Sequence, residues 1–306
     1  IAEWLKPKKF VGSMTQLLFY LVSVVISFFI QFGGFLVAYA LQTETFYDIL
    51  GGVNYIALIV WSAIHDPSLL SNPRKCMASV IFVFSRSWLL LFLAWRAHER
   101  GGDSRFDGVK DKFGKFLTFW MVQGMWVMFT SMPVLFVNAV ESNDLTLTYY
   151  DWISLTGFAT GVVLEVVADV QKAVWVSKGR AGVFCQTGLW GFSRHPNYFG
   201  EILQWWCAWA FAFTCSYGYT DALWWASAIS PMFTMHVLLN LPPTGIWNAE
   251  GKNLKRYYDK CADEYSKYRE STSILIPMIG YRYVPTFLKK TVFLDLPRYE
   301  YRSKKD

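Results

Sequence analysis

Long apolar runs constrain this chain more than any other feature, because each run is close to the length of a membrane-crossing helix. A helix needs about 20 apolar residues to cross a hydrocarbon core. Seven runs approach that length, in a chain that is 54% hydrophobic and only 17% charged. We therefore predict an all-α, polytopic membrane protein with about seven transmembrane helices in a lipid bilayer. The runs cover residues 14–41, 50–64, 77–95, 116–139, 152–171, 198–216 and 222–241.

Basic residues are distributed unevenly between the predicted loops. Of the 29 Lys and Arg residues, 23 fall in the loops at residues 96–115 and 172–194 and in the tail after residue 241. Because cytoplasmic loops are enriched in Lys and Arg, we predict that the C-terminus lies on the cytosolic, stromal or matrix side of an endoplasmic reticulum or organelle membrane. Lipid headgroups are sufficient neighbours for the net charge of +6, so no nucleic-acid partner is predicted.

The chain has no visible repeat and is predicted to form one membrane domain at residues 1–277, with the polar signature region at 165–277 and a peripheral tail at 278–306. Apolar residues recur at helical spacing from Leu254 to Tyr268, which predicts an amphipathic C-terminal helix. The apolar segment at 274–277 is expected to return to the helices. The five cysteines lack metal-type spacing and predict neither disulfides nor a metal site. The sequence begins with Ile1 rather than Met, which indicates a preceding segment.

A polar cluster stands at the start of the sixth predicted helix, in the stretch GLWGFSRHPNYFGEILQWW at residues 188–206. Pro196 suits the first turn of a helix, where its missing N–H costs nothing. The free amides and positive dipole end of such a helix favour an anion, such as a nucleotide phosphate. Basic residues stand nearby, and polar side chains follow at i, i+4 and i+7. The basic candidates are Lys178, Arg180, Arg194 and His195, and the polar stripe is Asn197, Glu201 and Gln204.

A matching stripe lies on the fifth predicted helix, where Glu165, Asp169 and Lys172 have the same spacing. Ionisable residues inside a membrane cost roughly 2.5–3.5 kcal/mol each, so several at one level indicate a partner or a ligand. In one interpretation the acidic residues pair with Arg194 or Lys172 and hold the helices together. In the other, which we adopt, the two stripes face each other across a shared nucleotide chamber.

Arg86 is a further ionisable residue within a predicted helix, near the middle of the third. It is either a ligand clamp or the counter-ion of Glu165 or Glu201. The chain has no glycine-rich strand-to-helix motif, which excludes a Rossmann dinucleotide site.

These motifs resemble the steroid 5-alpha-reductase family of polytopic membrane enzymes, and most closely its broad branch with the RHPNYFGE signature. The shorter core, RHPNY followed by Gly, is also similar to isoprenylcysteine carboxyl methyltransferases and related membrane methylases. The resemblance extends over most of the chain. It includes FYDILGGVNYIAL at 46–58, AWRAHERGGDSRF at 94–106, FWMVQGMWV at 119–127, EVVADVQK at 165–172 and YSKYRESTSILIP at 265–277, besides the stretch at 188–206.

The resemblance implies a seven-helix fold around a cavity that holds NADPH at the cytosolic end and a lipid-like enone deeper in the membrane. It implies hydride transfer from the nicotinamide to the carbon β to a carbonyl, while a protein acid protonates or polarises the oxygen. Arg194 and His195 would then lie at the phosphates. The predicted cofactor-binding residues are Glu165, Asp169, Lys172, Lys178, Arg180, Arg194, His195, Asn197, Tyr198, Glu201, Glu250 and Asn253.

The chain departs from the family pattern where steroid-reducing members engage the substrate oxygen. Those members use a glutamate in the second span and a tyrosine in the third, whereas here the second span lacks an obvious glutamate and residues 82–84 contain no tyrosine. The expected substrate is therefore a sterol, isoprenoid or other hydrophobic lipid rather than a steroid in particular. The nearest candidates for catalysis are Tyr47, Asp48, Tyr55 and Arg86.

Two other functions stay open beside an oxidoreductase that acts on a CH–CH group with NADPH. One is a methyltransferase that uses S-adenosylmethionine, in which Arg194 and His195 would bind the carboxylate of the methyl donor. The other is an architectural subunit of a membrane complex that retains the fold without turnover, because a fold alone does not determine an activity.

Overall fold

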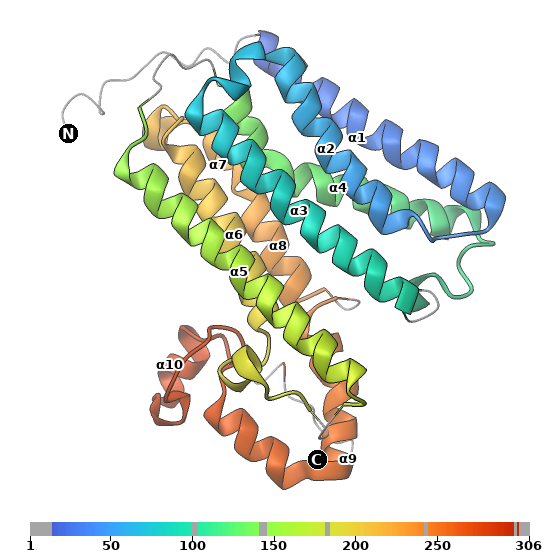
Figure 1. Cartoon of the computed structure of the whole chain (residues 1–306), viewed down its shortest axis with the longest axis vertical. Coiled ribbons are helices and arrows are strands. Elements are labelled where there is room, and N and C mark those ends of the chain that lie inside the picture. The colour runs from blue at the N-terminus through green and yellow to red at the C-terminus, as the bar shows by residue number, and fades with distance from the viewer. Residues whose placement is uncertain are drawn as a thin grey trace. The chain divides into compact units, whose positions relative to one another are not determined.

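The computed structural model of the chain is all-helical (Figure 1). It describes residues 14–99, 103–140, 146–180, 184–241, 244–296 and 299, of which residues 97, 104 and 247–256 are described without their side chains. The α-helices in these ranges are α1 (Met14–Leu41), α2 (Tyr47–His65), α3 (Pro73–Glu99), α4 (Phe113–Ala139), α5 (Tyr149–Ser177), α6 (Pro196–Phe213), α7 (Ala222–Ser227), α8 (Ile229–Leu239), α9 (Ile246–Ser271) and α10 (Thr286–Thr291).

Six helical segments among the described residues are long and apolar enough to cross a membrane. They are α1 to α5 and the segment Ala222–Leu239, which contains α7 and α8. This finding confirms the prediction of an all-α, multi-pass membrane protein. The predicted count of seven differs by α6, which has 18 residues and includes the polar side chains Asn197, Glu201 and Gln204. The last predicted span also differs, because it is interrupted at Ala228.

Two compact units make up the chain. Unit 1 contains Ile1–Leu155 and Cys207–Ser230, and unit 2 contains Thr156–Trp206 and Pro231–Asp306. The helices α5, α6 and α8 therefore contribute residues to both units.

In unit 1, helices α1 to α4 pack against one another (Figure 1), and small and polar residues lie at some of their contacts. Ser27 Oγ on α1 donates a hydrogen bond to the Gly124 carbonyl on α4 at 3.3 Å, and Asn54 Nδ2 on α2 donates to Ser27 Oγ at 3.0 Å. Small residues allow membrane helices to approach closely, and such hydrogen bonds hold them together. The apolar side chains on the other side of α1 are exposed, as expected for a surface that faces lipid, and include Leu17, Leu21, Val25 and Phe29.

In unit 2, α5 and α6 approach each other through two glycines. A Cβ atom built on Gly200 would lie 2.6 Å from the Gly161 carbonyl oxygen, and one on Gly161 would lie 2.6 Å from the Gly200 carbonyl oxygen. A Cβ carbon does not approach a carbonyl oxygen so closely, and therefore this crossing requires glycine at both positions. Near these glycines, the Phe158 and Trp205 rings meet edge to face with centroids 6.2 Å apart.

The amphipathic helix predicted near the C-terminus is α9. On its described part, Tyr257, Tyr265 and Tyr268 are buried against Phe184, which confirms the apolar face predicted for them. The helix bends at Cys261, where the backbone has the non-helical angles φ −156° and ψ 48°.

The segment that follows α9 returns to the start of α6, as the apolar residues at 274–277 predict. Ser193 and Ser273 form an isolated parallel bridge, and Ser193 Oγ donates a hydrogen bond to the Leu275 carbonyl at 2.7 Å. Ile274 and Leu275 are buried in the same apolar cluster as Leu238 and Leu239 of α8. This segment thereby joins the signature stretch to the C-terminal part of unit 2.

Candidate functional site

Five ionisable side chains are buried around the first turns of α6 in unit 2. The chain reverses before this helix through the 3-10 turn Gly188–Gly191, and Pro196 then opens α6 at its first position. Burial of this many ionisable groups is costly in a membrane protein and is a common property of functional sites. The exposed fractions are 3% for Glu165, 7% for Asp169, 4% for Arg194, 7% for His195 and 6% for Glu201.

The two polar stripes of α5 and α6 face each other, as predicted. Asn197 Nδ2 donates a hydrogen bond to Asp169 Oδ1 at 3.1 Å, and Gln204 Nε2 donates to Glu165 Oε2 at 2.6 Å. At these two levels the side chains of the stripes bond directly to one another. The glycines Gly161 and Gly200 allow the two helix backbones to approach closely where they cross.

One hydrogen-bond acceptor of this cluster is available to a ligand. Asn197 Oδ1 is buried and has no hydrogen-bond partner among the described residues, while Nδ2 of the same amide is held by Asp169. An unpaired buried carbonyl oxygen costs free energy that a donor from a ligand or a water molecule would recover. The open acceptor lies at the first turn of α6, on the same amide that bonds Asp169.

Arg194 of the signature is bound by the C-terminal part of the chain. Its Nη2 donates to Asp295 Oδ1 at 2.9 Å, and the other carboxylate oxygen of Asp295 accepts a hydrogen bond from the Tyr281 hydroxyl at 2.8 Å. Burial, and then this hydrogen bond to the carboxylate, raise the pKa of Tyr281, so that its hydroxyl remains a donor. The Arg194 side chain is 2% exposed. An anionic ligand of Arg194 would compete with Asp295.

The other predicted basic residues differ in their surroundings. The Lys172 ammonium lies over the Trp190 ring, 4.0 Å from its centroid. Lys178 and Arg180 are exposed at and beyond the end of α5, and Arg180 has a positive φ of 57° that continues the turn begun by Gly179. These two side chains are thus in solvent at the helix end rather than in the buried cluster.

His195 and Tyr198 pack together at the start of α6. Their rings are stacked with centroids 5.2 Å apart, and the Tyr198 hydroxyl donates to the Thr244 carbonyl at 2.8 Å. The stacking fixes the side of the helix on which the imidazole lies. Two further predicted cofactor residues, Glu250 and Asn253, belong to α9 at positions outside the described side chains.

The four candidates for catalysis belong to unit 1, where the two tyrosines are engaged by hydrogen bonds. The Tyr47 hydroxyl donates to the Phe119 carbonyl at 2.9 Å, and the Tyr55 hydroxyl shares a hydrogen bond with Thr130 Oγ1 at 2.8 Å. Asp48 accepts a hydrogen bond from Arg105 Nη2 at 3.2 Å. Arg86 is 1% exposed and donates from Nη2 to Ser85 Oγ at 3.0 Å.

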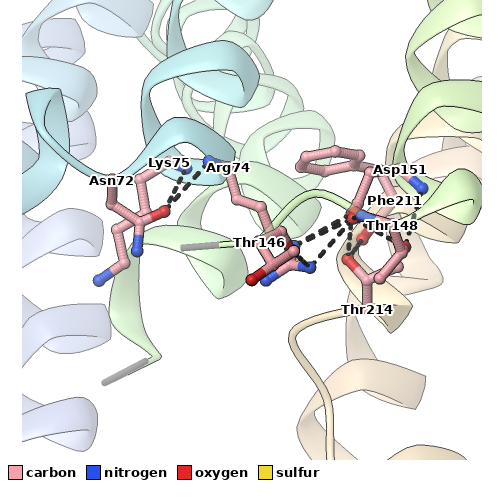
Figure 2. A network of polar contacts seen from close by, with 8 residues as sticks. All are labelled: Asn72, Arg74, Lys75, Thr146, Thr148, Asp151, Phe211 and Thr214. Carbon is pink, nitrogen blue, oxygen red and sulfur yellow. Dashed lines mark hydrogen bonds and ion pairs between the residues drawn. The ribbon is translucent and has the colours of Figure 1, made fainter. Parts of the chain in front are cut away.

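Another buried ion pair in unit 1 was not anticipated as part of any site (Figure 2). Arg74 at the start of α3 donates from Nε and Nη2 to the carboxylate of Asp151 at the start of α5, at 3.1–3.2 Å. Asp151 is fully buried and also accepts from Thr148 and Thr214, at 2.8 Å and 2.6 Å from their hydroxyl oxygens. Each carboxylate oxygen has at least two donors, which is typical of a structural connection.

Two pairings in these clusters were missed for identifiable reasons. Asp295 lies 101 residues after Arg194, and no local pattern specifies a contact across that separation. The one available signal was its isolation, since no other acidic residue occurs between Glu270 and Asp295. Arg74 stands in a predicted loop before the apolar run at 77–95, although Asp151 stands at the start of an apolar helix where an acidic residue needs a partner.

A protein family matches most of the chain. The family described as "Protein of unknown function (DUF1295)" matches residues 34–272, which include the α5 and α6 stripes and the RHPNY stretch. The chain belongs to this family. No curated protein and no solved structure matches the chain significantly. In this DUF1295 member, Asp295, which binds Arg194, lies beyond the matched residues.

Proposed function

We propose that this DUF1295 membrane protein is an NADPH-dependent reductase of a carbon–carbon double bond in an enone of a sterol, isoprenoid or other lipid. The observation that carries the proposal is the group of buried ionisable side chains at the start of α6, which include Arg194, His195 and Glu201. Buried charge of both signs at a helix N-terminus suits a ligand that has both phosphates and hydrogen-bond donors.

The donors and acceptors of unit 2 fit the chemistry of a dinucleotide. The open Oδ1 of Asn197 would accept from an amide or amine N–H, and the carboxylates of Asp169 and Glu201 would accept from ribose hydroxyls. Arg194 and the first amides of α6 would bind phosphate, with Lys172 adding positive charge on α5. The Arg194 guanidinium is held by the Asp295 carboxylate, which is consistent with a group arranged to bind an oxyanion.

Bound NADPH would supply the hydride, and the residues of the chain would orient the lipid and stabilise negative charge on its carbonyl oxygen. Arg86 could stabilise negative charge on the carbonyl oxygen, because it is fully buried and a guanidinium has five N–H donors. Tyr55 is the alternative donor, through the hydroxyl that it now shares with Thr130. Burial of either group excludes water and strengthens its effect on the oxygen.

NADPH titration of the purified full chain in detergent, followed by nicotinamide fluorescence, tests the proposal. We expect saturable binding that weakens about tenfold or more in Asn197→Ala, because one or more hydrogen bonds of about 1.4 kcal/mol would be lost. Lys267→Ala is the matched control, since Lys267 is exposed on α9. No binding at millimolar NADPH would refute the proposal.

The Arg194–Asp295 pair also favours a second function, a methyltransferase that uses S-adenosylmethionine. The amino-acid carboxylate of this methyl donor would replace Asp295 at the Arg194 guanidinium. Calorimetric titration with S-adenosylhomocysteine distinguishes the two enzymes, because each cofactor product would bind only one of them. A chain that binds neither cofactor but copurifies in a stoichiometric membrane complex would instead be an architectural subunit.

We propose that the C-terminal part of the chain faces the cytosol, stroma or matrix of an endoplasmic reticulum or organelle membrane. The support is the excess of Lys and Arg in the loops and tail assigned to that side. Protease treatment of sealed vesicles with a known orientation tests this, with an epitope after residue 306 as the readout. Protection of the epitope in vesicles whose cytosolic face is outside would reverse the orientation.

A further inference from the structure

The C-terminal segment of unit 2 turns several large apolar side chains outward. Ile279 is 83% exposed, Tyr283 is 87% exposed and Phe287 on α10 is 71% exposed (α10 in Figure 1). Several exposed apolar side chains within one short folded segment indicate an interaction surface. We call this surface the tail patch, defined as Ile279, Tyr283, Phe287, Leu288 and Val292 with the exposed basic residues Arg282 and Lys290.

Buried contacts hold the segment that presents the tail patch. Tyr281 is fully buried, its hydroxyl donates to Asp295, and its ring packs edge to face on Phe293 with centroids 5.2 Å apart. The Lys289 ammonium covers the Tyr281 ring at 4.5 Å from the centroid. The outward direction of the patch side chains is therefore fixed by the fold of the segment.

The same segment is attached where a membrane helix ends. Leu238 and Leu239 are the last residues of the candidate span Ala222–Leu239, and they share an apolar cluster with Ile274 and Leu275. Leu294 and Leu296, just after the patch, pack against this cluster. Segments fixed at the end of a span lie at the depth of the lipid headgroups, where aromatic and basic side chains are enriched.

The charged residues of the segment that presents the tail patch are all basic. Between Glu270 and Asp295 the chain has three basic residues and no acidic residue. A surface with apolar and aromatic side chains beside Lys and Arg matches the boundary of a membrane that contains anionic lipids. We propose that the tail patch binds the surface of the surrounding bilayer, with Ile279, Tyr283 and Phe287 entering the interface and the basic residues contacting anionic headgroups.

Photocrosslinking of the full chain in lipid nanodiscs tests this contact. We would introduce p-benzoylphenylalanine in place of Phe287, and in place of Lys267 on α9 as the control, since both side chains are exposed. After irradiation, mass spectrometry should find phospholipid adducts at position 287, at a yield at least about fivefold above position 267. Absence of lipid adducts at 287, or crosslinks to a second copy or another protein instead, would overturn the proposal.

Lipid charge provides the second readout. In nanodiscs that contain phosphatidylserine, adduct formation at position 287 should exceed that in pure phosphatidylcholine several-fold, and Arg282→Glu with Lys290→Glu should remove the difference. Lys260→Glu with Lys267→Glu on α9 is the charge-matched control and should leave the difference unchanged. Equal yields in the two lipids would overturn the anionic-lipid preference. Because no cofactor is involved, the result is independent of the proposed reductase activity.

Discussion

The Arg74–Asp151 pair of unit 1 and the polar cluster at the start of α6 in unit 2 are arranged in different ways. In unit 1, Arg74 and Asp151 form several hydrogen bonds with each other, and threonine hydroxyls donate further hydrogen bonds to the Asp151 carboxylate (Figure 2). In unit 2, Asn197 retains a buried oxygen without a partner among the described residues, and Arg194 depends on a carboxylate from the far end of the chain. Complete satisfaction is typical of a structural tie, whereas an open acceptor beside a replaceable ion pair is typical of a binding site.

Asp151→Ala should give the largest effect and tests the structural assignment of the unit 1 pair. Removal of the carboxylate leaves the Arg74 guanidinium buried and unpaired, so the free energy of unfolding should fall by about 3–5 kcal/mol. Unfolding in mixed detergent micelles with increasing dodecyl sulfate measures this change. The double variant Arg74→Met with Asp151→Leu should recover most of the loss, and a double variant as unstable as Asp151→Ala would contradict the assignment.

Asp295→Ala should have the next largest effect, about 2–3 kcal/mol in the same unfolding assay. The loss is smaller than for Asp151 because the Asp295 side chain is 16% exposed, so that water partly replaces it. Tyr281→Phe is the matched comparison and should cost only about 1 kcal/mol, since Arg194 keeps its counter-ion. If Asp295→Ala were neutral, the ion pair would not contribute to the stability of unit 2.

Gly200→Val tests whether the closed contact between the α5 and α6 stripes depends on the glycine crossing. The added side chain would meet the Gly161 carbonyl, and we expect a loss of about 1–3 kcal/mol from overpacking. Gly33→Ala is the control, because a Cβ at Gly33 of α1 has no heavy atom within 4 Å. Equal stability of the two variants would show that the stripes can separate without cost.

A fall in pH should have the smallest effect, because it weakens the Asp66–Lys75 ion pair of unit 1. We expect the free energy of unfolding to fall by up to about 1 kcal/mol. Burial raises the pKa of Asp66, but hydrogen bonds from Lys75 and Ser68 outweigh it and leave the pKa below its ordinary value. The stabilisation is therefore present above about pH 4 and is lost as the pH falls through the folded pKa. Unfolding free energies from pH 6 to pH 3 measure it, and Asp66→Asn should abolish this part of the dependence.

The helices and the facing stripes were predictable because they rest on local periodicity. α1 occupies residues 14–41, as the apolar run predicts, and the i, i+4 spacing placed Asn197 opposite Asp169. The direct contact between the stripes was not predictable from the polar residues alone, because it depends on Gly161 and Gly200. These glycines lie on two different helices, and no local sequence pattern shows that they meet. The break at Ala228 likewise lies within a continuous apolar run.

The dependence of Arg194 on Asp295 has a consequence for biosynthesis. The ribosome must add 101 residues after the arginine before its partner exists. At roughly 5–20 residues per second, this takes about 5–20 s. Throughout that interval the guanidinium has to be solvated by water, by lipid phosphate or by an assembly factor, so the signature motif is completed late in synthesis although it is translated much earlier.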